Sequence, residues 1–107
     1  MAIVVMVQDR EGREVALTDI RWQHIVTRHA ELATRQDEVL LTVAMPDFVT
    51  VDPETGFEQS YREIQDDTNR RPMWMKVVIL YGQIGGSVIL TAHRTHRVRP
   101  REVQRWP

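Results

Sequence analysis

All four histidines of this chain lie in two short segments near its opposite ends. His24 and His29 belong to the first segment, and His93 and His96 belong to the second. Imidazole can give and take protons near neutral pH because its unperturbed pKa is about 6.5. Arginine, threonine or both stand close to every one of these histidines. Imidazole, guanidinium and hydroxyl groups together can move protons and stabilise anionic charge, which is the chemistry of a phosphodiester site.

Cleavage of RNA without a metal ion needs groups of these kinds. Transesterification requires a base that activates the ribose 2′-hydroxyl, an acid that protonates the departing 5′-oxygen, and cations near the phosphorane. Threonine hydroxyls can orient phosphate oxygens by hydrogen bonding. We take His29 and His93 as the proton-transfer pair. The candidate catalytic residues are His29, His93, His24 and Arg28, and the candidate substrate-binding residues are Thr91, Arg94, Thr95 and Arg97.

A metal site is the main competing explanation, and the spacing does not favour it. His24 and His29 are five residues apart, which does not place them on one helix face. His93 and His96 would lie on opposite faces of a continuous strand. The chain has no cysteine, which excludes a disulfide framework, a cysteine-ligated zinc site and a thiolate nucleophile. The sequence therefore predicts no metal and no cofactor.

The elements that must position these residues follow from the hydrophobic pattern. Residues 2–7 and 14–17 are apolar and extended, with a turn-forming stretch between them, and indicate a hairpin. A threonine N-cap and the spacing of apolar residues predict a helix over about 19–32. A second helix is expected to start at a cap on Thr34 and to end before Pro46.

After the second helix the pattern becomes extended, and turn residues separate four apolar or alternating segments. Helices grouped early and strands grouped late favour an α+β fold. We expect an N-terminal hairpin and two helices packed on an antiparallel sheet of about four strands. The predicted strands span residues 48–51, 57–64, 74–81 and 87–95, with a charged loop at 66–72 and a turn at 83–86.

The last predicted strand carries the second histidine segment. Strict alternation places Ala92 on one face and Ile89, Thr91 and His93 on the other, with Thr95 continuing that row. A helix that crosses the sheet would bring the first histidine segment opposite this row. The functional prediction depends on that crossing.

The composition fits one soluble domain. A chain of 107 residues with 42% hydrophobic residues can form one modest core but not two ordinary domains. We expect residues 1–97 to form the domain and residues 98–107 to form a loosely ordered basic C-terminal tail. The apolar start is too short for a signal peptide, and no stretch approaches the roughly 20 apolar residues of a membrane span. The expected location is therefore cytoplasmic, with no membrane partner.

Taken in order, several motifs of the chain resemble one nuclease superfamily. They cover roughly residues 15–97. The resemblance is to the barnase, EndoU, colicin and RelE-like nucleases, and in particular to their small branch from phages and mobile elements. The motifs are Leu17-Thr18, Trp22-x-His24-Ile25-x2-Arg28-His29-x-Glu31, Pro46-Asp47 and Val88-Ile89-Leu90-Thr91-Ala92-His93.

The resemblance implies an RNase-like fold and a metal-independent endoribonuclease that acts as a toxin. It also implies RNA as the substrate and an antitoxin or immunity protein as a partner. By matching positions, it places one group of residues on the helix side of the site and another on the sheet side. These are His24, Arg28 and His29 on the helix side, and Thr91 and His93 on the sheet side.

The chain departs from this branch at two positions. Ala30 stands where a proline is frequent, so the helix need not break there, and His93 stands where an aromatic residue such as tyrosine is frequent. These departures and the net charge of -1 leave a second hypothesis open, a non-catalytic nuclease-fold module that binds RNA or a protein partner. A third is an interaction protein whose acidic residues 47–67 and arginine-rich C-terminus pair between two copies in a homodimer.

Overall fold

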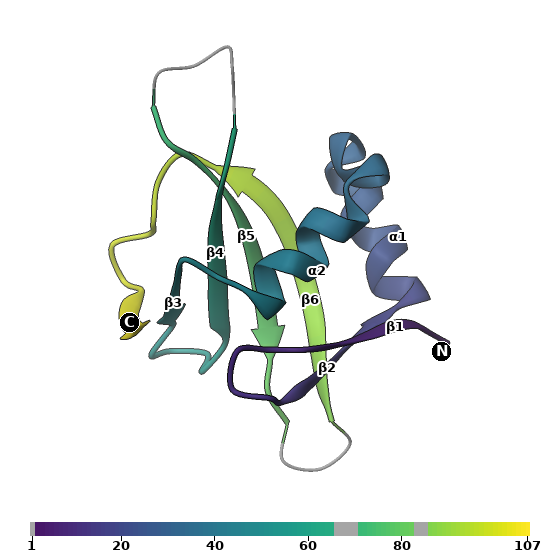
Figure 1. Ribbon diagram of the computed structural model, residues 1–107, viewed down its shortest axis with the longest axis horizontal. Coiled ribbons are helices and arrows are strands. Elements are labelled where there is room, and N and C mark those ends of the chain that lie inside the picture. Colours follow the sequence, from purple (N-terminus) through teal and green to yellow (C-terminus); the bar gives the residue numbers. More distant parts are fainter. Residues whose placement is uncertain (1, 66–70, 83–85) are drawn as a thin grey trace.

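The computed structural model describes residues 2–65, 71–82 and 86–107 of the chain. Within these residues the architecture is α+β, with helices packed against a seven-stranded mixed sheet (Figure 1). The strand order across the sheet is β1-β2-β6-β5-β4-β3-β7. The helices are α1 (Asp19–Arg28), the short 3₁₀ helix η1 (Ala30–Thr34) and α2 (Gln36–Ala44). The strands are β1 (Ile3–Gln8), β2 (Glu14–Thr18), β3 (Phe48–Val51), β4 (Glu58–Ile64), β5 (Met73–Leu80), β6 (Ser87–Thr95) and β7 (Val103–Trp106).

The prediction of an antiparallel sheet of about four strands is wrong. Strands β3 to β6 are antiparallel neighbours, but the sheet continues beyond them at both edges. At one edge β2 of the N-terminal hairpin pairs in parallel with the start of β6, and at the other edge β7 pairs with β3. A two-stranded hairpin is only marginally stable by itself, so docking on β6 stabilises it and satisfies backbone groups of both strands. The alternation of apolar residues along a strand does not reveal which edge the strand joins.

The C-terminal segment is an ordered part of this sheet, and the expectation of a loosely ordered tail is also wrong. β7 pairs antiparallel with β3, with Val51 opposite Val103 and Thr50 opposite Gln104. The Arg10 guanidinium lies 3.8 Å from the centre of the Trp106 ring, a distance at which cation and ring attract each other. The last residues of the chain therefore contact both β3 and the turn after β1.

Helix α1 is shorter than the predicted helix over 19–32. The Thr18 hydroxyl caps its N-terminus by accepting the Arg21 N–H at 3.3 Å. The helix ends at Arg28, because His29 leaves helical geometry with φ -134° and ψ 74°. The remaining residues of the predicted helix form η1, which buries Leu32 completely. His29 thus lies at a corner between two helical segments rather than inside one helix.

Helix α2 matches the second predicted helix except at its first residues. It begins after Arg35, which makes no side-chain capping bond, and not at the expected cap on Thr34. It ends before Pro46, as proline requires. Its buried residues, Val39 and Val43 among them, face the sheet.

The hydrophobic core lies between the helices and one face of the sheet. Alternate residues of β5 and the buried residues of β6 point toward the helices, which leaves Lys76 and Val78 of β5 on the opposite face. That opposite face is called the open face below. The core consists of Val15, Leu17, Ile25, Leu32, Val39, Val43, Met75, Val77, Ile79, Ile89 and Ala92.

A β-bulge decides which residues of β6 share the open face. β6 pairs with β5 on both sides of Leu90, which is left as an extra residue in the ladder. The bulge places Ile89 and Ala92 together in the core, whereas strict alternation predicted them on opposite faces. Thr91 and His93 pair with outward-facing residues of β5 and therefore lie on the open face.

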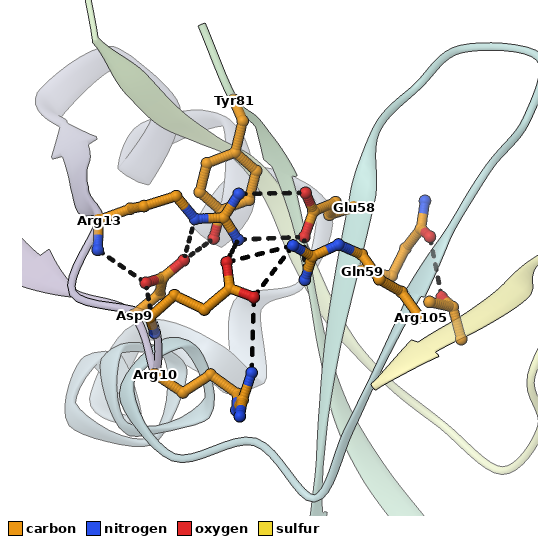
Figure 2. A network of polar contacts seen from close by, with 9 residues as sticks. Asp9, Arg10, Arg13, Glu58, Gln59, Tyr81 and Arg105 are labelled. Atoms are coloured by element: carbon orange, nitrogen blue, oxygen red, sulfur yellow. Dashed lines mark hydrogen bonds and ion pairs between the residues drawn. The ribbon is translucent and has the colours of Figure 1, made fainter. Parts of the chain in front are cut away.

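A polar network joins the N-terminal hairpin to strands at the far side of the sheet (Figure 2). Asp9 accepts hydrogen bonds from the Tyr81 hydroxyl and from Arg13 Nε, both at 2.8 Å. Arg13 reaches Glu58 at the start of β4 at 3.4 Å, and Arg105 of β7 reaches the same carboxylate at 3.5 Å. Burial raises the pKa of Asp9, but the hydrogen bonds from Tyr81 and Arg13 outweigh it, so the pKa is lowered overall.

The predicted charged loop at 66–72 and the predicted turn at 83–86 lie largely outside the described residues.

Candidate functional site

The two predicted proton-transfer histidines lie next to each other. The ring centroids of His29 and His93 are 5.5 Å apart, and the rings are stacked with an angle of 25° between their planes. His29 reaches this position from the corner after α1, where its backbone N–H donates to Ile25 O at 2.8 Å. Besides its hairpin partner β1, β2 pairs with the start of β6, and α1 packs against β6 beside it (Figure 1). The helix therefore carries His29 to the part of β6 that holds His93.

His93 occupies a cationic and partly buried position on the open face. It is the register partner of Lys76 in β5, which in turn is the partner of Tyr61 in β4. Burial, together with the positive charges of Lys76, His29 and Arg99, lowers the pKa of His93 to about 4. His93 is therefore neutral at pH 7, which is the form of imidazole that accepts a proton.

A pocket of about 220 Å³ opens beside His93 on the open face. The strands β4, β5 and β6 form its floor, and the segment after β6 forms one wall. His29 does not line this pocket but stacks on the ring of His93. The lining residues are Asp52, Thr55, Phe57, Gln59, Lys76, Val78, Thr91, His93, Arg99, Arg101 and Glu102.

Glu102 holds the C-terminal segment against the open face. Its carboxylate accepts hydrogen bonds from Lys76 Nζ at 2.7 Å, from the Tyr61 hydroxyl at 2.6 Å and from the Thr50 hydroxyl at 2.6 Å. The side chains of Glu102 and Lys76 are only 1% and 7% exposed. Burial raises the pKa of Glu102, but the hydrogen bonds from Lys76, Thr50 and Tyr61 outweigh it and lower the pKa overall. Glu102 is therefore an ionised buried anchor.

This anchor fixes two arginines at the pocket. Arg101 adjoins Glu102 and pairs with Asp52 at 3.0 Å and with Glu54 at 3.2 Å. Arg99 is exposed, and it makes no ion pair with another residue of the described chain. Of the two guanidinium groups, that of Arg99 is thus the one left available to an anionic ligand.

The structure brings only some of the predicted substrate-binding residues to the pocket. Thr91 lines it. Arg94 belongs to the other face of β6, where its Nε lies 4.0 Å from Glu31 Oε1. The Thr95 hydroxyl is engaged in a local turn, since it donates to Arg97 O at 3.1 Å and accepts the Arg97 N–H at 3.3 Å. Arg97 is exposed and does not line the pocket.

The two remaining catalytic candidates come from α1. Arg28 is exposed in the last turn of the helix, and His24 is half-buried one turn earlier. Among the described residues, no hydrogen bond, ion pair or ring contact joins either of them to the His29 and His93 pair. The fourth histidine, His96, lies with Nδ1 3.0 Å from Pro72 O.

Sequence reasoning missed most of the pocket. Lys76, Gln59, Arg99, Arg101 and Glu102 were not among the candidates, although all five line it. One signal was available, since the only lysine of the chain stands in the middle of its most apolar strand. A charged residue is almost never fully buried without a partner, so this lysine indicated a buried ion pair. The identity of the acidic partner, 26 residues later, could not be read from the sequence.

No group of three or more His, Asp or Glu side chains that could hold a metal ion occurs in the described part of the chain. No helix formed by those residues is long and apolar enough to cross a membrane. The chain matches no protein-family model, and no curated protein or solved structure is significantly similar to it.

Proposed function

We propose that this protein is a metal-independent endoribonuclease that cleaves RNA by general acid-base transesterification. The observation that carries the proposal is the 5.5 Å separation of the imidazoles of His29 and His93. Rings this close can both serve one phosphodiester, one as the base and the other as the acid. The relation to the barnase, EndoU, colicin and RelE-like superfamily stays a prediction that rests on the sequence motifs.

The electrostatics of the site support a role for each imidazole. His93, with a pKa near 4, is neutral at pH 7 and suits the base that accepts the 2′-hydroxyl proton. His29 then supplies the proton to the departing 5′-oxygen. Arg99 provides positive charge where the phosphorane develops negative charge, and the Lys76 ammonium, which is hydrogen-bonded to Glu102, adds to it.

The test is incubation of the purified protein with mixed RNA in EDTA. We expect cleavage by the wild type and a loss of about 10²- to 10⁴-fold for His29→Ala and for His93→Ala, because each removes a proton-transfer group. Gln23→Ala changes an exposed residue of α1 and serves as the control with unchanged activity. No cleavage by the wild type, or equal cleavage by both histidine variants, would refute the proposal.

A second candidate is a module that binds RNA without cleaving it. One observation favours it: proton transfer is most efficient when the pKa lies near the working pH, and a base with a pKa near 4 is weak at pH 7. RNA binding that weakens with salt, in the absence of any cleavage product, would select this candidate over the ribonuclease.

A further inference from the structure

The pocket beside His93 has two chemically different ends. The cross-strand register places Tyr61, Lys76 and His93 in one row of the open face. The next row contains Gln59, Val78 and Thr91, and Phe57 lies beyond it. The first row carries charge and the proton-transfer group. The second row offers an aliphatic side chain, an amide, a hydroxyl and a nearby aromatic ring.

The amide of Gln59 can be oriented from its hydrogen bonds. The Thr50 hydroxyl lies 2.9 Å from Gln59 Oε1 and 2.6 Å from Glu102 Oε1, but it has one proton to donate. Glu102 is ionised and can only accept, so it takes this proton through the shorter bond. The Thr50 oxygen must then accept a bond from the amide, which requires Gln59 to present its NH₂ group to Thr50.

This orientation leaves the carbonyl oxygen of Gln59 for a ligand. Gln59 is only 4% exposed and lines the pocket. The end of its amide away from Thr50 makes no hydrogen bond to another described residue. A carbonyl oxygen in this position accepts a hydrogen bond from an N–H or NH₂ group and repels an anion. The second row is therefore unsuited to a phosphate.

The size of the pocket limits the ligand further. Drug-sized sites measure roughly 300 to 1,000 Å³. The volume of about 220 Å³ is smaller, and the apolar groups of Phe57 and Val78 favour a flat ring. A single nucleobase satisfies these conditions, since every base has a flat face and an N–H or NH₂ group at its edge.

We propose that Phe57, Gln59, Val78 and Thr91 form a nucleobase subsite, which holds the base adjoining the phosphate at Lys76 and His93. The inference rests on the proposed function, because it assigns RNA as the ligand of the same pocket. In this arrangement the Gln59 carbonyl accepts a hydrogen bond from the edge of the base. The first row of the pocket binds the phosphate, and the second row selects the base.

The test compares binding of the four nucleoside 3′-monophosphates with binding of ribose 5-phosphate, by titration calorimetry with the full chain. At least one nucleotide should bind about tenfold or more tightly than ribose 5-phosphate. Gln59→Leu should remove roughly tenfold of that preference, since it deletes one base hydrogen bond. Gln8→Leu makes the same change at an exposed residue of β1 and should leave the preference unaltered.

Thr91→Val keeps the shape of the side chain and removes its hydroxyl, so it tests the subsite even if Gln59→Leu does not fold. It should weaken nucleotide binding. Equal binding of nucleotides and ribose 5-phosphate, or a preference that survives both variants, would overturn the subsite. The cleavage assay in EDTA separates the two proposals: cleavage without nucleotide preference overturns only the subsite, whereas nucleotide preference without cleavage overturns only the ribonuclease.

Discussion

The position of His93 beside Lys76, across two paired strands, governs its protonation. Burial and the neighbouring positive charges disfavour the imidazolium form, so the folded protein holds the pKa near 4, below the unperturbed value of 6.5. His29 stacks on the ring and adds to this effect. His93 is therefore neutral over the whole physiological pH range, which affects both the stability and the activity of the protein.

The first prediction concerns stability. The unfolded chain binds a proton at His93 below pH 6.5, whereas the folded chain does so only below about pH 4. Between these values the unfolded state binds more protons, so the free energy of unfolding decreases as the pH falls from 6.5 to 4. His93→Gln, which cannot titrate, should show a smaller decrease over this window in urea denaturation. Parallel pH dependences for the variant and the wild type would show that His93 is not held neutral.

The second prediction concerns the pH dependence of RNA cleavage. If His93 is the base, kcat/KM should stay on its plateau as the pH is lowered to about 5 and should fall with a midpoint near pH 4. The pH profile of kcat/KM reports pKa values of the free enzyme, so its midpoint can be compared directly with the pKa of His93 in the structure. A midpoint near 6.5 would contradict the assignment of the base to His93.

For single residues, the sequence predicted that His29 and His93 lie together, but it did not predict most of the side chains around them. The alternation of Thr91 and His93 and the helical segment before His29 were local patterns, and the two imidazoles do meet. Arg94 was expected on the substrate, but it pairs with Glu31 on the other face of β6. Strand alternation itself separates neighbouring residues onto opposite faces, so proximity in sequence to His93 was a poor guide.

Among the elements, the C-terminal segment has the largest effect on the site. It crosses from the end of β6 to β7, and Glu102 anchors it by three hydrogen bonds. Through this anchor the segment brings Arg99 and Arg101 to the pocket. Prolines and alternating arginines gave it no apolar pattern, and the buried contacts of a single carboxylate leave no periodic signal. The apolar pattern of the hairpin predicts its strands but not the strand beside which they lie, so the parallel pairing of β2 with β6 was not predicted.

The third prediction tests this anchor. Glu102→Gln should lower the free energy of unfolding by about 3 kcal/mol, because it leaves the Lys76 charge buried without its counterion. Glu54→Gln removes a carboxylate that is 78% exposed and should cost less than about 1 kcal/mol. Adding Lys76→Met to Glu102→Gln should restore most of the loss, which urea denaturation of the double variant would reveal. If the double variant is no more stable than Glu102→Gln, the ion pair is not the cause.

At the scale of the whole molecule, the distribution of charge affects the binding of RNA more than the net charge of -1 does. Most arginines of the hairpin and of β7 are paired with carboxylates, as in the network of Asp9, Arg13, Glu58 and Arg105. The cations at the pocket are few, and they are Lys76, Arg99 and Arg101. The protein should therefore contact few phosphates of an RNA strand.

The fourth prediction follows from this count of cations. A contact with a single-stranded phosphate contributes about -0.7 to the slope of log K against log salt. Lys76 and Arg101 are already paired with carboxylates, so Arg99 alone gives an expected slope of about -0.7. Arg99→Ala should make the slope about 0.7 units shallower. Fluorescence anisotropy with a short labelled RNA measures both values. A slope far steeper than this would indicate an extended basic surface in place of one pocket.

The central claim is that two adjacent imidazoles cleave RNA by attack of a 2′-hydroxyl. The most direct measurement uses a DNA strand with one ribonucleotide, incubated with the protein in EDTA. The account predicts a single cut after the ribonucleotide, a 2′,3′-cyclic phosphate on the new end, and no cut by His93→Ala. It would be contradicted by an intact strand, or by equal cutting of the strand that lacks the ribonucleotide.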